Sequence, residues 1–285
     1  LIGAFLSSTP PFQNAMAMDA NRCGIPVVYG FCRGVGSGSY AAAVLLLGFV
    51  LERHAPTLLL PVFAALTACG LIAMSGFRLP ERPDEAADRP AEHRSIAAVL
   101  RSHPRFALTL LGCMFFFLTH TISNTYMNAL VGKAGGTASA VGTSLAISAV
   151  LELPAMTLVS RLQKRFSPGF FLRFAAGAEV VKFLIFYLAR SMPLIYLGHC
   201  MQFFQFAVYA PATVYYVAAA LPERDQLKGQ SLIYVAGSGL GGALGNLLGG
   251  RLLDRSGIQA ALLLGTVSAA ASLLTFCLST REDSR

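Results

Sequence analysis

Apolar residues run along this chain in blocks of about 20, which are interrupted by charges, proline or glycine rather than by a repeating polar face. An α-helix needs a block of about that length to cross the hydrocarbon core of a bilayer, whereas a barrel strand alternates in polarity over about ten residues. The segments Tyr40–Leu51 and Ala260–Leu278 run apolar almost without a break. The pattern therefore predicts an all-α polytopic membrane protein.

Nine blocks are long enough to be transmembrane helices. Their predicted bounds are Leu1–Met18, Tyr29–Leu51, Pro56–Phe77, Phe106–Leu130, Ala138–Ser160, Gly169–Ala189, Pro193–Ala220, Gly229–Arg251 and Gly257–Ser279. The polar segment Arg78–Arg105, with six arginines and five acidic residues, separates the third block from the fourth. We expect the last three helices of an N-terminal bundle in residues 1–77, a linker in 78–105 and a six-helix C-terminal bundle in 106–285.

Composition and charge agree with this prediction. Hydrophobic residues make up 55% of the 285 residues and charged residues 13%, against about 25% charged in a soluble domain. The net charge of +8 would suit nucleic-acid binding, but the cations are scattered through the connections between apolar blocks, and we expect no nucleic-acid partner. With connections on alternate sides, 15 cations fall on the linker side and 5 on the other, which places the linker and the C-terminus in the cytoplasm.

An internal repeat relates the second and third blocks to the eighth and ninth. At a constant offset, Gly48 falls on Gly250 and Arg53 on Arg255, and each copy begins with a glycine-rich stretch. A same-direction repeat on either side of a linker is typical of two parallel bundles, so nine helices would be three plus six and a complete protein would have twelve. The glycines of residues 237–250 predict close helix packing, because no strand precedes them as in a phosphate loop.

Several motifs resemble one branch of the major facilitator superfamily, which holds lactose permease, oligosaccharide:proton symporters and phenylpropionate permeases. After Pro10-Pro11-Phe12-Gln13, the segment 29–37 is similar to the branch's tyrosine/phenylalanine-Gly-Arg-x-Arg-x-x-Gly-Ser signature, of which only the second arginine is present, as Arg33. Leu151-Glu152-Leu153-Pro154 resembles the family's glutamate motif in the eighth helix. Lys182 stands where the family often has an arginine.

The resemblance implies a secondary transporter that works by alternating access, with its solute near the bilayer midplane between the two halves. It favours proton-coupled transport of a sugar or oligosaccharide by a monomer in the bacterial cytoplasmic (inner) membrane. The expected partners are a small-molecule solute, protons and the lipid bilayer. An aromatic acid or nucleoside permease, a drug exporter and a non-transporting membrane sensor remain alternatives. We expect no enzyme, cofactor or metal site, since no nucleophile–base pair or metal-ligand spacing occurs.

Charged residues inside a membrane are costly and usually functional, which directs attention to Arg33, Glu152, Glu179 and Lys182 within the predicted helices. The residues predicted to bind the solute are Gln13, Arg33, Tyr40, His120, Asn128, Lys182, Gln202 and Gln205. The residues predicted to carry protons are Glu152 and Glu179. Because Glu179 and Lys182 are neighbours on one helix face, a purely structural ion pair is the alternative there.

Two further spacings support this set. His120, Asn124 and Asn128 recur every four residues and predict one polar helix face, either lining the solute cavity or joining helices. By the resemblance, Gln202 and Gln205 occupy the positions of a histidine and a proton-coupling glutamate. Glutamine can hydrogen-bond a solute but cannot carry a proton, so coupling would rest on the two glutamates or be absent. Gln13 likewise replaces a family glutamate, and Tyr40 stands near a sugar-stacking tryptophan.

Overall fold

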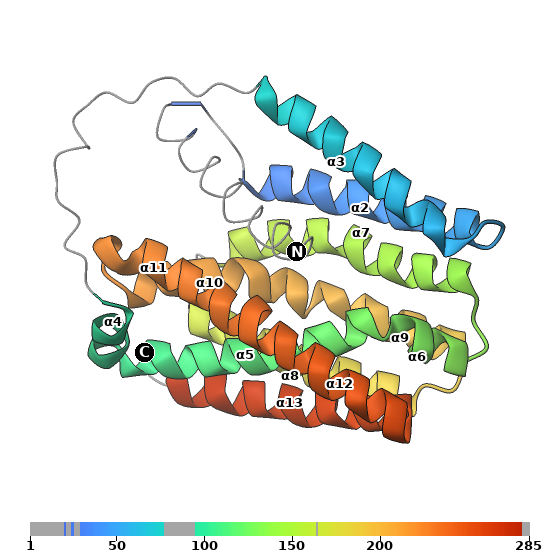
Figure 1. The fold of residues 1–285 in the computed structure, drawn as a ribbon. Helices are drawn as coiled ribbons and strands as arrows, with labels where there is room; N and C mark the ends of the chain where they lie inside the picture. The colour runs from blue at the N-terminus through green and yellow to red at the C-terminus, as the bar shows by residue number, and fades with distance from the viewer. Residues whose placement is uncertain (1–19, 21–23, 26–28, 77–94, 164, 281–285) are drawn as a thin grey trace.

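The computed structural model describes residues 20, 24–25, 29–76, 95–163 and 165–280, and these ranges are helical apart from short connections (Figure 1). The α-helices are α2 (Tyr29–Leu51), α3 (Leu59–Ser75), α4 (Ile96–Ser102), α5 (Pro104–Thr125), α6 (Met127–Lys133), α7 (Ala138–Leu162), α8 (Pro168–Leu188), α9 (Met192–Cys200), α10 (Phe206–Ala220), α11 (Glu223–Tyr234), α12 (Gly242–Ser256) and α13 (Ile258–Ser279). The all-α prediction is confirmed. The first predicted helix, Leu1–Met18, lies outside the described residues.

Each remaining predicted helix coincides with one helix or with two helices in line. Helix α2 has the predicted bounds, whereas three predicted helices are interrupted. The breaks fall at Tyr126 between α5 and α6, at the 3₁₀ turn Met201–Phe203 between α9 and α10, and at the π-helical segment Val235–Gly241 between α11 and α12. The sequence pattern did not predict these breaks, because each one lies inside a block that is long and uncharged. The breaks matter for the site because they change which side chains share a face.

The segment predicted as a polar linker contains a helix at its end. Helix α4 begins after Ser95, whose hydroxyl accepts a hydrogen bond from the Ala98 amide at 3.2 Å. Val99 is fully buried against the apolar core. The short helix therefore docks on the start of α5 rather than continuing the chain as a loop. Residues 77–94 of the predicted linker lie outside the described residues.

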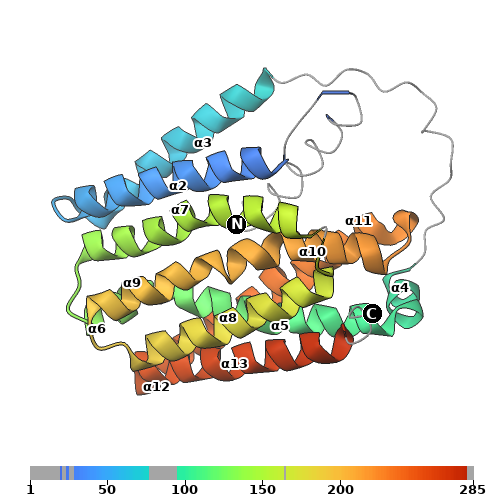
Figure 2. The ribbon, with the colours of Figure 1, turned by 180° about the vertical axis from the view of Figure 1, so that it is seen from behind.

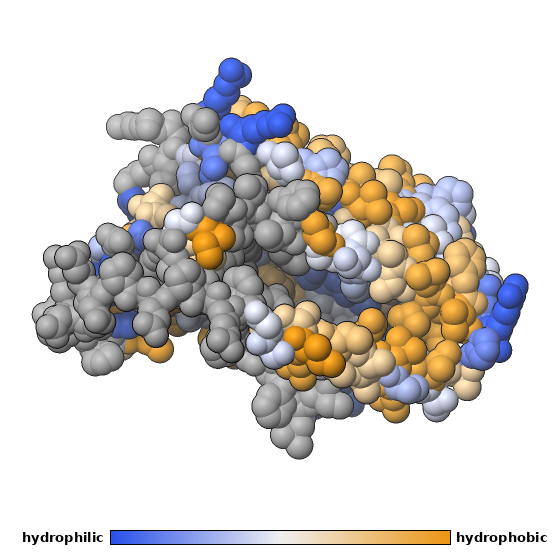
Figure 3. Space-filling model, turned by 90° about the horizontal axis from the view of Figure 1, so that it is seen from above, coloured by the Kyte–Doolittle hydropathy of each residue, from blue (hydrophilic) through white to orange (hydrophobic). Residues whose placement is uncertain are grey.

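Five helical stretches among the described residues are long and apolar enough to cross a membrane. They are Pro104–Thr125, Ala138–Val159, Met192–Ala220, Arg224–Ser256 and Ile258–Ser279. Shorter apolar helices cover Val35–Leu51 and Leu59–Ser75. Seen from above, apolar side chains cover most of the coloured surface in the half of the molecule that holds the α2–α3 turn (Figure 3). Hydrophilic side chains gather at the far end of that half. The chain is an integral membrane protein.

The helices lie side by side along a common direction (Figures 1 and 2). The α2–α3 turn, α6 and the end of α12 lie at one end of the molecule, while α4 and the start of α11 lie at the other. Helix α2 packs along α7, and α5 packs against both α12 and α13. None of the residues of α3 is buried within the described part of the chain. Helix α7 thus separates α2 and α3 from the helices that follow it.

The core of the later helices combines apolar packing with hydroxyl contacts. One cluster joins α5, α8, α10 and α13 and includes Phe116, Leu172 and Phe276, all fully buried. The hydroxyls of Ser268 and Ser272 on α13 donate to backbone carbonyls of α5 at 3.0 Å. Such hydroxyl bonds join helices where lipid supplies no hydrophobic driving force. These contacts hold α5, which carries His120 and Asn124, against α13.

Close packing of the glycine-rich segment is confirmed. A Cβ on Gly245 would lie 2.7 Å from the carbonyl oxygen of Leu118, so α12 touches the backbone of α5. A second close approach joins α2 and α7, where a Cβ on Gly142 would lie 2.6 Å from the carbonyl oxygen of Val44. On the α2 side of this contact, a Cβ on Gly48 would lie 3.3 Å from the Cα atom of Gly142. The contact near the α2–α3 turn therefore depends on residues without a Cβ.

Candidate functional site

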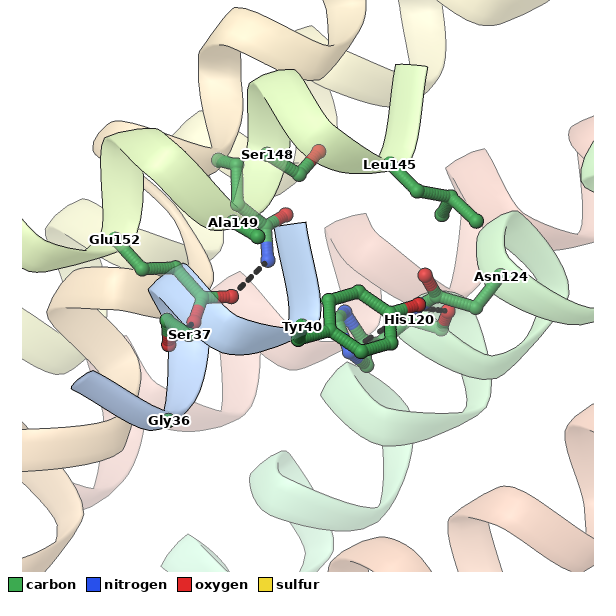
Figure 4. A pocket seen from close by; sticks show the side chains of 10 residues that line it. Gly36, Ser37, Tyr40, His120, Asn124, Leu145, Ser148, Ala149 and Glu152 are labelled. Atoms are coloured by element: carbon green, nitrogen blue, oxygen red, sulfur yellow. Dashed lines mark hydrogen bonds between the residues drawn. The ribbon is translucent and has the colours of Figure 1, made fainter. Parts of the chain in front are cut away.

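A cavity of about 290 Å³ lies between α2, α5 and α7 (Figure 4). Its wall combines hydroxyl, amide, imidazole and carboxyl groups with a few small or apolar side chains. The lining residues are Gly36, Ser37, Tyr40, His120, Asn124, Leu145, Ser148, Ala149, Glu152 and Gln202. A concave site with a small number of placed polar groups is typical of small-molecule binding.

Helix α7 supplies one wall because its lining residues share a face. Leu145, Ser148, Ala149 and Glu152 follow one another at steps of three, one and three residues, which is the spacing of one helical stripe. Val150, on the opposite face, is 58% exposed. Pro154 lies within the helix just after Glu152. The α7 stripe places a carboxyl group at the cavity wall, deep in the predicted membrane span.

Glu152 is held by donors from two other elements. The Ser37 hydroxyl on α2 donates to Glu152 Oε2 at 2.7 Å, and the Gln202 side-chain amide donates to Glu152 Oε1 at 3.1 Å. Figure 4 shows the amide donation as a dashed line. Both oxygens accept, which suits an ionised carboxylate because that form has no proton to donate. Glu152 therefore ties α2, from one predicted bundle, to two elements of the other.

A buried cation continues this network away from the cavity. The Lys182 ammonium on α8 donates to Gln202 Oε1 at 3.1 Å and is 2% exposed. Gln202 thus links Lys182 to Glu152, with its carbonyl oxygen towards the cation and its amide towards the carboxylate. Lys182 Nζ also lies 5.8 Å from the centroid of the Phe186 ring. The chain of contacts runs from the cavity wall into the helical core.

Glu179 is buried one turn before Lys182 on the same helix. It is 0% exposed, and neither carboxyl oxygen has a hydrogen-bond partner in the structure. A buried carboxyl without donors strongly disfavours its charged form unless a cation approaches. Because Lys182 donates to Gln202 instead, Glu179 has the surroundings of a carboxyl that holds a proton.

His120 and Asn124 form the α5 wall. The Asn124 amide lies 3.1 Å from His120 Nε2 and 2.9 Å from the His120 backbone oxygen, so the two residues are neighbours one turn apart. The His120 ring stacks on Phe206, with centroids 4.4 Å apart and planes at 9°. His120 Nδ1 is buried without a hydrogen-bond partner. The ring is thus fixed by α10 while Asn124 remains exposed towards the cavity.

The structure brings four of the eight predicted solute-binding residues together. Tyr40, His120 and Gln202 line the cavity, and Lys182 reaches it through Gln202. Gln13 lies outside the described residues, and Arg33 lies in α2 with a side chain that is also outside them.

Asn128 and Gln205 are separated from the cavity by helix breaks. Asn128 lies in α6, beyond the break at Tyr126, so the four-residue spacing does not keep it on the face of His120. Gln205 follows the 3₁₀ turn after Gln202, and its backbone is neither helical nor extended. It is fully buried, and neither its amide nitrogen nor its oxygen has a hydrogen-bond partner among the described residues. Neither residue is among the cavity-lining side chains.

Sequence reasoning missed three polar residues of the site, Ser37, Ser148 and His199. Ser148 stands one turn before Glu152, and that spacing could have indicated a shared face. Ser37 is one of several serines in a small-residue stretch, where nothing distinguishes it from a packing residue. His199 is 2% exposed and bonds Ser148 from α9, a contact between residues far apart in the sequence.

Comparison with protein families agrees with the helical fold. The profile of the MFS_1 like family matches residues 3–264. The chain belongs to this family. MFS denotes the major facilitator superfamily, so the resemblance seen in the sequence motifs is confirmed.

Two curated relatives match most of the chain. It is 28% identical over 257 residues to the maltose permease of Geobacillus stearothermophilus. This alignment covers 90% of this chain and 64% of the permease. It is 22% identical over 258 residues to the uncharacterized transporter YwbF of Bacillus subtilis (strain 168), with the same coverage. The chain thus spans less than two thirds of the length of these relatives. Both are named as transport proteins, which supports the expectation that the chain is no enzyme.

Solved structures support the same fold. A variant of the Escherichia coli fucose:proton symporter FucP superposes with a TM-score of 0.56 at 18% identity, covering 81% of this chain and 60% of the symporter. A structure of FucP in the outward conformation gives a TM-score of 0.53 at 17% identity, covering 81% and 59%. At these identities the likeness shows the major facilitator fold alone.

Proposed function

We propose that the protein is a secondary transporter that moves a small hydroxyl-rich solute, most simply a sugar, across the membrane together with protons. The observation that carries this proposal is the position of Glu152. Its carboxylate lies at the cavity wall and bonds Ser37 on α2 and Gln202 between α9 and α10. Alternating access requires a solute site at the junction of two helical bundles, and the contacts of Glu152 join α2 of the predicted N-terminal bundle to elements of the predicted C-terminal bundle.

The chemistry of the cavity wall supports a sugar. Hydroxyl, amide and carboxyl groups can each exchange hydrogen bonds with sugar hydroxyls, and a carboxylate accepts the stronger, charge-assisted ones. Tyr40, 50% exposed and lining the cavity, offers a ring face for the apolar side of a sugar. The 28% identity to the maltose permease of Geobacillus stearothermophilus also supports a sugar as the solute.

Two carboxyls support proton coupling. Glu179 is buried without a partner, whereas Glu152 accepts two hydrogen bonds. Lys182 is one turn from Glu179 on α8 and is linked to Glu152 through Gln202. When Glu179 is protonated and neutral, Lys182 can donate to Gln202 and so support the hydrogen bonds of Glu152. Loss of that proton would draw Lys182 back to Glu179, one turn away. Protonation and the arrangement of the cavity wall would then be linked, as a symporter requires.

Orientation follows from the distribution of cations in the sequence. The excess on the side of α4 and the last residues of α13 favours a cytoplasmic C-terminus in a bacterial inner membrane. The α2–α3 turn would then face the outside. We propose that the protein acts as a monomer, because the cavity is formed by helices of one chain.

Uptake assays on cells that express the full-length protein test the proposal. We expect accumulation of labelled maltose or a related sugar that collapses when a protonophore removes the proton gradient. Glu152→Gln should reduce uptake about tenfold or more, because a hydrogen bond to a charged group contributes about 1.5–3 kcal/mol. The matched control Asp254→Asn, an exposed carboxyl on α12, should keep normal uptake.

Other outcomes of the same screen select the alternatives. Uptake of aromatic acids or nucleosides but no sugar would replace the solute class and leave the carrier function intact. Lower accumulation of dyes or drugs would indicate export. No movement of any solute, with normal insertion into the membrane, would contradict transport and favour a sensor.

A further inference from the structure

Ser148 and His199 form a polar pair at the edge of the cavity. Ser148 lies on the cavity wall of α7 and is 9% exposed, while His199 on α9 is 2% exposed and does not line the cavity. Ser148 Oγ is 2.7 Å from His199 Nδ1. Figure 4 places Ser148 on the α7 wall near Ala149. A buried side chain from a second helix therefore fixes a hydroxyl that faces the solute space.

The other nitrogen of the imidazole ring is isolated. His199 Nε2 is buried and has no hydrogen-bond partner in the structure. The centroid of the Phe186 ring lies 5.2 Å from that of His199, with the two ring planes at 48°. Within the part of the chain that the structure describes, the bond to Ser148 is the one side-chain hydrogen bond of this histidine. The imidazole ring therefore forms a hydrogen bond through Nδ1 to Ser148 and none through Nε2 among the described residues.

This asymmetry favours one tautomer. A neutral imidazole carries one N–H, and the other nitrogen is an acceptor. If Nε2 carried the hydrogen, a buried N–H donor would have no acceptor, whereas a buried acceptor without a donor is the more common and less costly case. The hydrogen is therefore assigned to Nδ1, which donates to Ser148 Oγ. The serine O–H is then not used by His199 and can turn to the cavity.

We propose that His199 is a positioning residue that makes Ser148 a hydrogen-bond donor to the transported solute. The inference rests on the proposed function and adds a selection rule to it. A solute that places an acceptor oxygen, such as a sugar hydroxyl or ring oxygen, against this part of α7 is favoured. A solute that offers only a donor or a C–H there is disfavoured, because the serine proton has no acceptor.

The tautomer can be tested without transport. The ring nitrogens of ¹⁵N-histidine-labelled full-length protein in detergent report directly which nitrogen carries the hydrogen. His199→Asn identifies the His199 signals by their disappearance. We expect a neutral ring with hydrogen on Nδ1, and a change in that signal in Ser148→Ala. Hydrogen on Nε2, or a doubly protonated ring, would overturn the proposal.

The positioning role can be tested by a double-mutant cycle on uptake of labelled maltose. Ser148→Ala and His199→Ala should each raise KM about three- to tenfold with little change in Vmax, the range expected for one hydrogen bond. The double variant should be no worse than either single variant, because His199 acts through Ser148. His199→Asn keeps a side-chain N–H donor and should recover part of the affinity that His199→Ala loses. This recovery would show that the loss in His199→Ala comes from the missing donor and not from misfolding.

Independent, multiplying effects of the two substitutions, or losses in Vmax without a change in KM, would contradict the positioning role. If the wild-type protein takes up no maltose at all, the proposed solute is wrong. The tautomer measurement still decides the inference about His199 in that case.

Discussion

The contact between α2 and α7 has two parts of opposite character. Near its middle, Ser37 and Glu152 meet through a single hydrogen bond beside a cavity. Nearer the α2–α3 turn, Gly48 and Gly142 bring the two backbones together with no side chain between them. The same helix pair is therefore open and polar at one point and closed and apolar at the other.

The difference suits the proposed function, in which one interface holds a solute and also closes on one side of the membrane. A hydrogen bond can be exchanged for a bond to solute or water, so the polar part can open without a large change in free energy. At the glycines themselves the two backbones touch directly, so this part depends on close packing. We call the Gly48–Gly142 contact the glycine crossing. In this conformation the glycine crossing closes the end of the interface at the α2–α3 turn.

The largest effect is expected from filling the glycine crossing. In Gly142→Leu the added side chain must displace the α2 backbone, since even a Cβ would lie 2.6 Å from the Val44 oxygen. Overpacking of this kind costs about 1–3 kcal/mol. We expect a lower thermal midpoint of the purified full-length protein. Gly177→Ala on α8, where an added Cβ has nothing within 4 Å, is the control and should leave the midpoint unchanged or raise it.

An unchanged midpoint in Gly142→Leu would mean that α2 and α7 do not approach closely at the glycine crossing. Gly142→Ala provides a graded version of the test. It should give a smaller change in the same direction.

A smaller effect, and one on affinity rather than on stability, is expected at the polar part. Ser37→Ala removes the α2 donor to Glu152 but leaves the Gln202 donor in place. Water in the cavity can replace the lost donor, so the thermal midpoint should change little. We expect KM for the transported sugar to rise up to about tenfold. A large loss of stability with normal KM would reverse the roles of the two parts.

The smallest effect concerns Glu52, just beyond the glycine crossing. Hydrogen bonds from the Ser139 and Thr137 hydroxyls and from the Ser139 amide hold the pKa of the Glu52 carboxyl below its ordinary value of 4.5. A lowered pKa means that the contact stabilises the folded state above that value and is lost as the pH falls through the lowered pKa. Thr137 Oγ1 donates to Glu52 Oε1 at 2.9 Å and fixes the start of α7 to the end of α2.

Hydrogen exchange at the first amides of α7 can measure this contact. We expect faster exchange at Ser139 in Glu52→Gln than in the wild type at neutral pH, and a smaller difference under acidic conditions. Equal exchange rates at Ser139 in Glu52→Gln and in the wild type at neutral pH would show that Glu52 does not hold the end of α2 against the start of α7. Because Glu52 is exposed to solvent, the effect should stay local.

The fold was largely predictable because membrane helices are specified by long apolar blocks. The bounds of α2 coincide with the prediction, and the second to ninth predicted helices all occur. The breaks at Tyr126 and after Cys200 were not predicted, because neither break carries proline or a charged residue and the few polar residues there, such as Asn124 and Gln202, are compatible with a continuous helix. The site was affected most at these two points, where Asn128 and Gln205 leave the expected face.

The candidate site was predictable where a residue is unusual for a membrane. Glu152, Glu179 and Lys182 attract attention as charges within apolar helices, and all three lie in or beside one buried network. Ser37, Ser148 and His199 are ordinary in sequence, since serine is common in helix contacts and a lone histidine is often a packing residue. Their roles depend on which helices become neighbours, and that is a property of the tertiary fold.

Solute protection of a cysteine in the cavity tests the central claim most directly. Leu145→Cys, in a full-length protein without its native cysteines, places a thiol on the cavity wall, and Val150→Cys places one on the opposite face of α7. We predict that the transported sugar, at about ten times its Kd, slows reaction of Leu145→Cys with a small thiol reagent about tenfold and leaves Val150→Cys unchanged. Equal rates with and without sugar at Leu145→Cys would contradict a solute site between α2, α5 and α7.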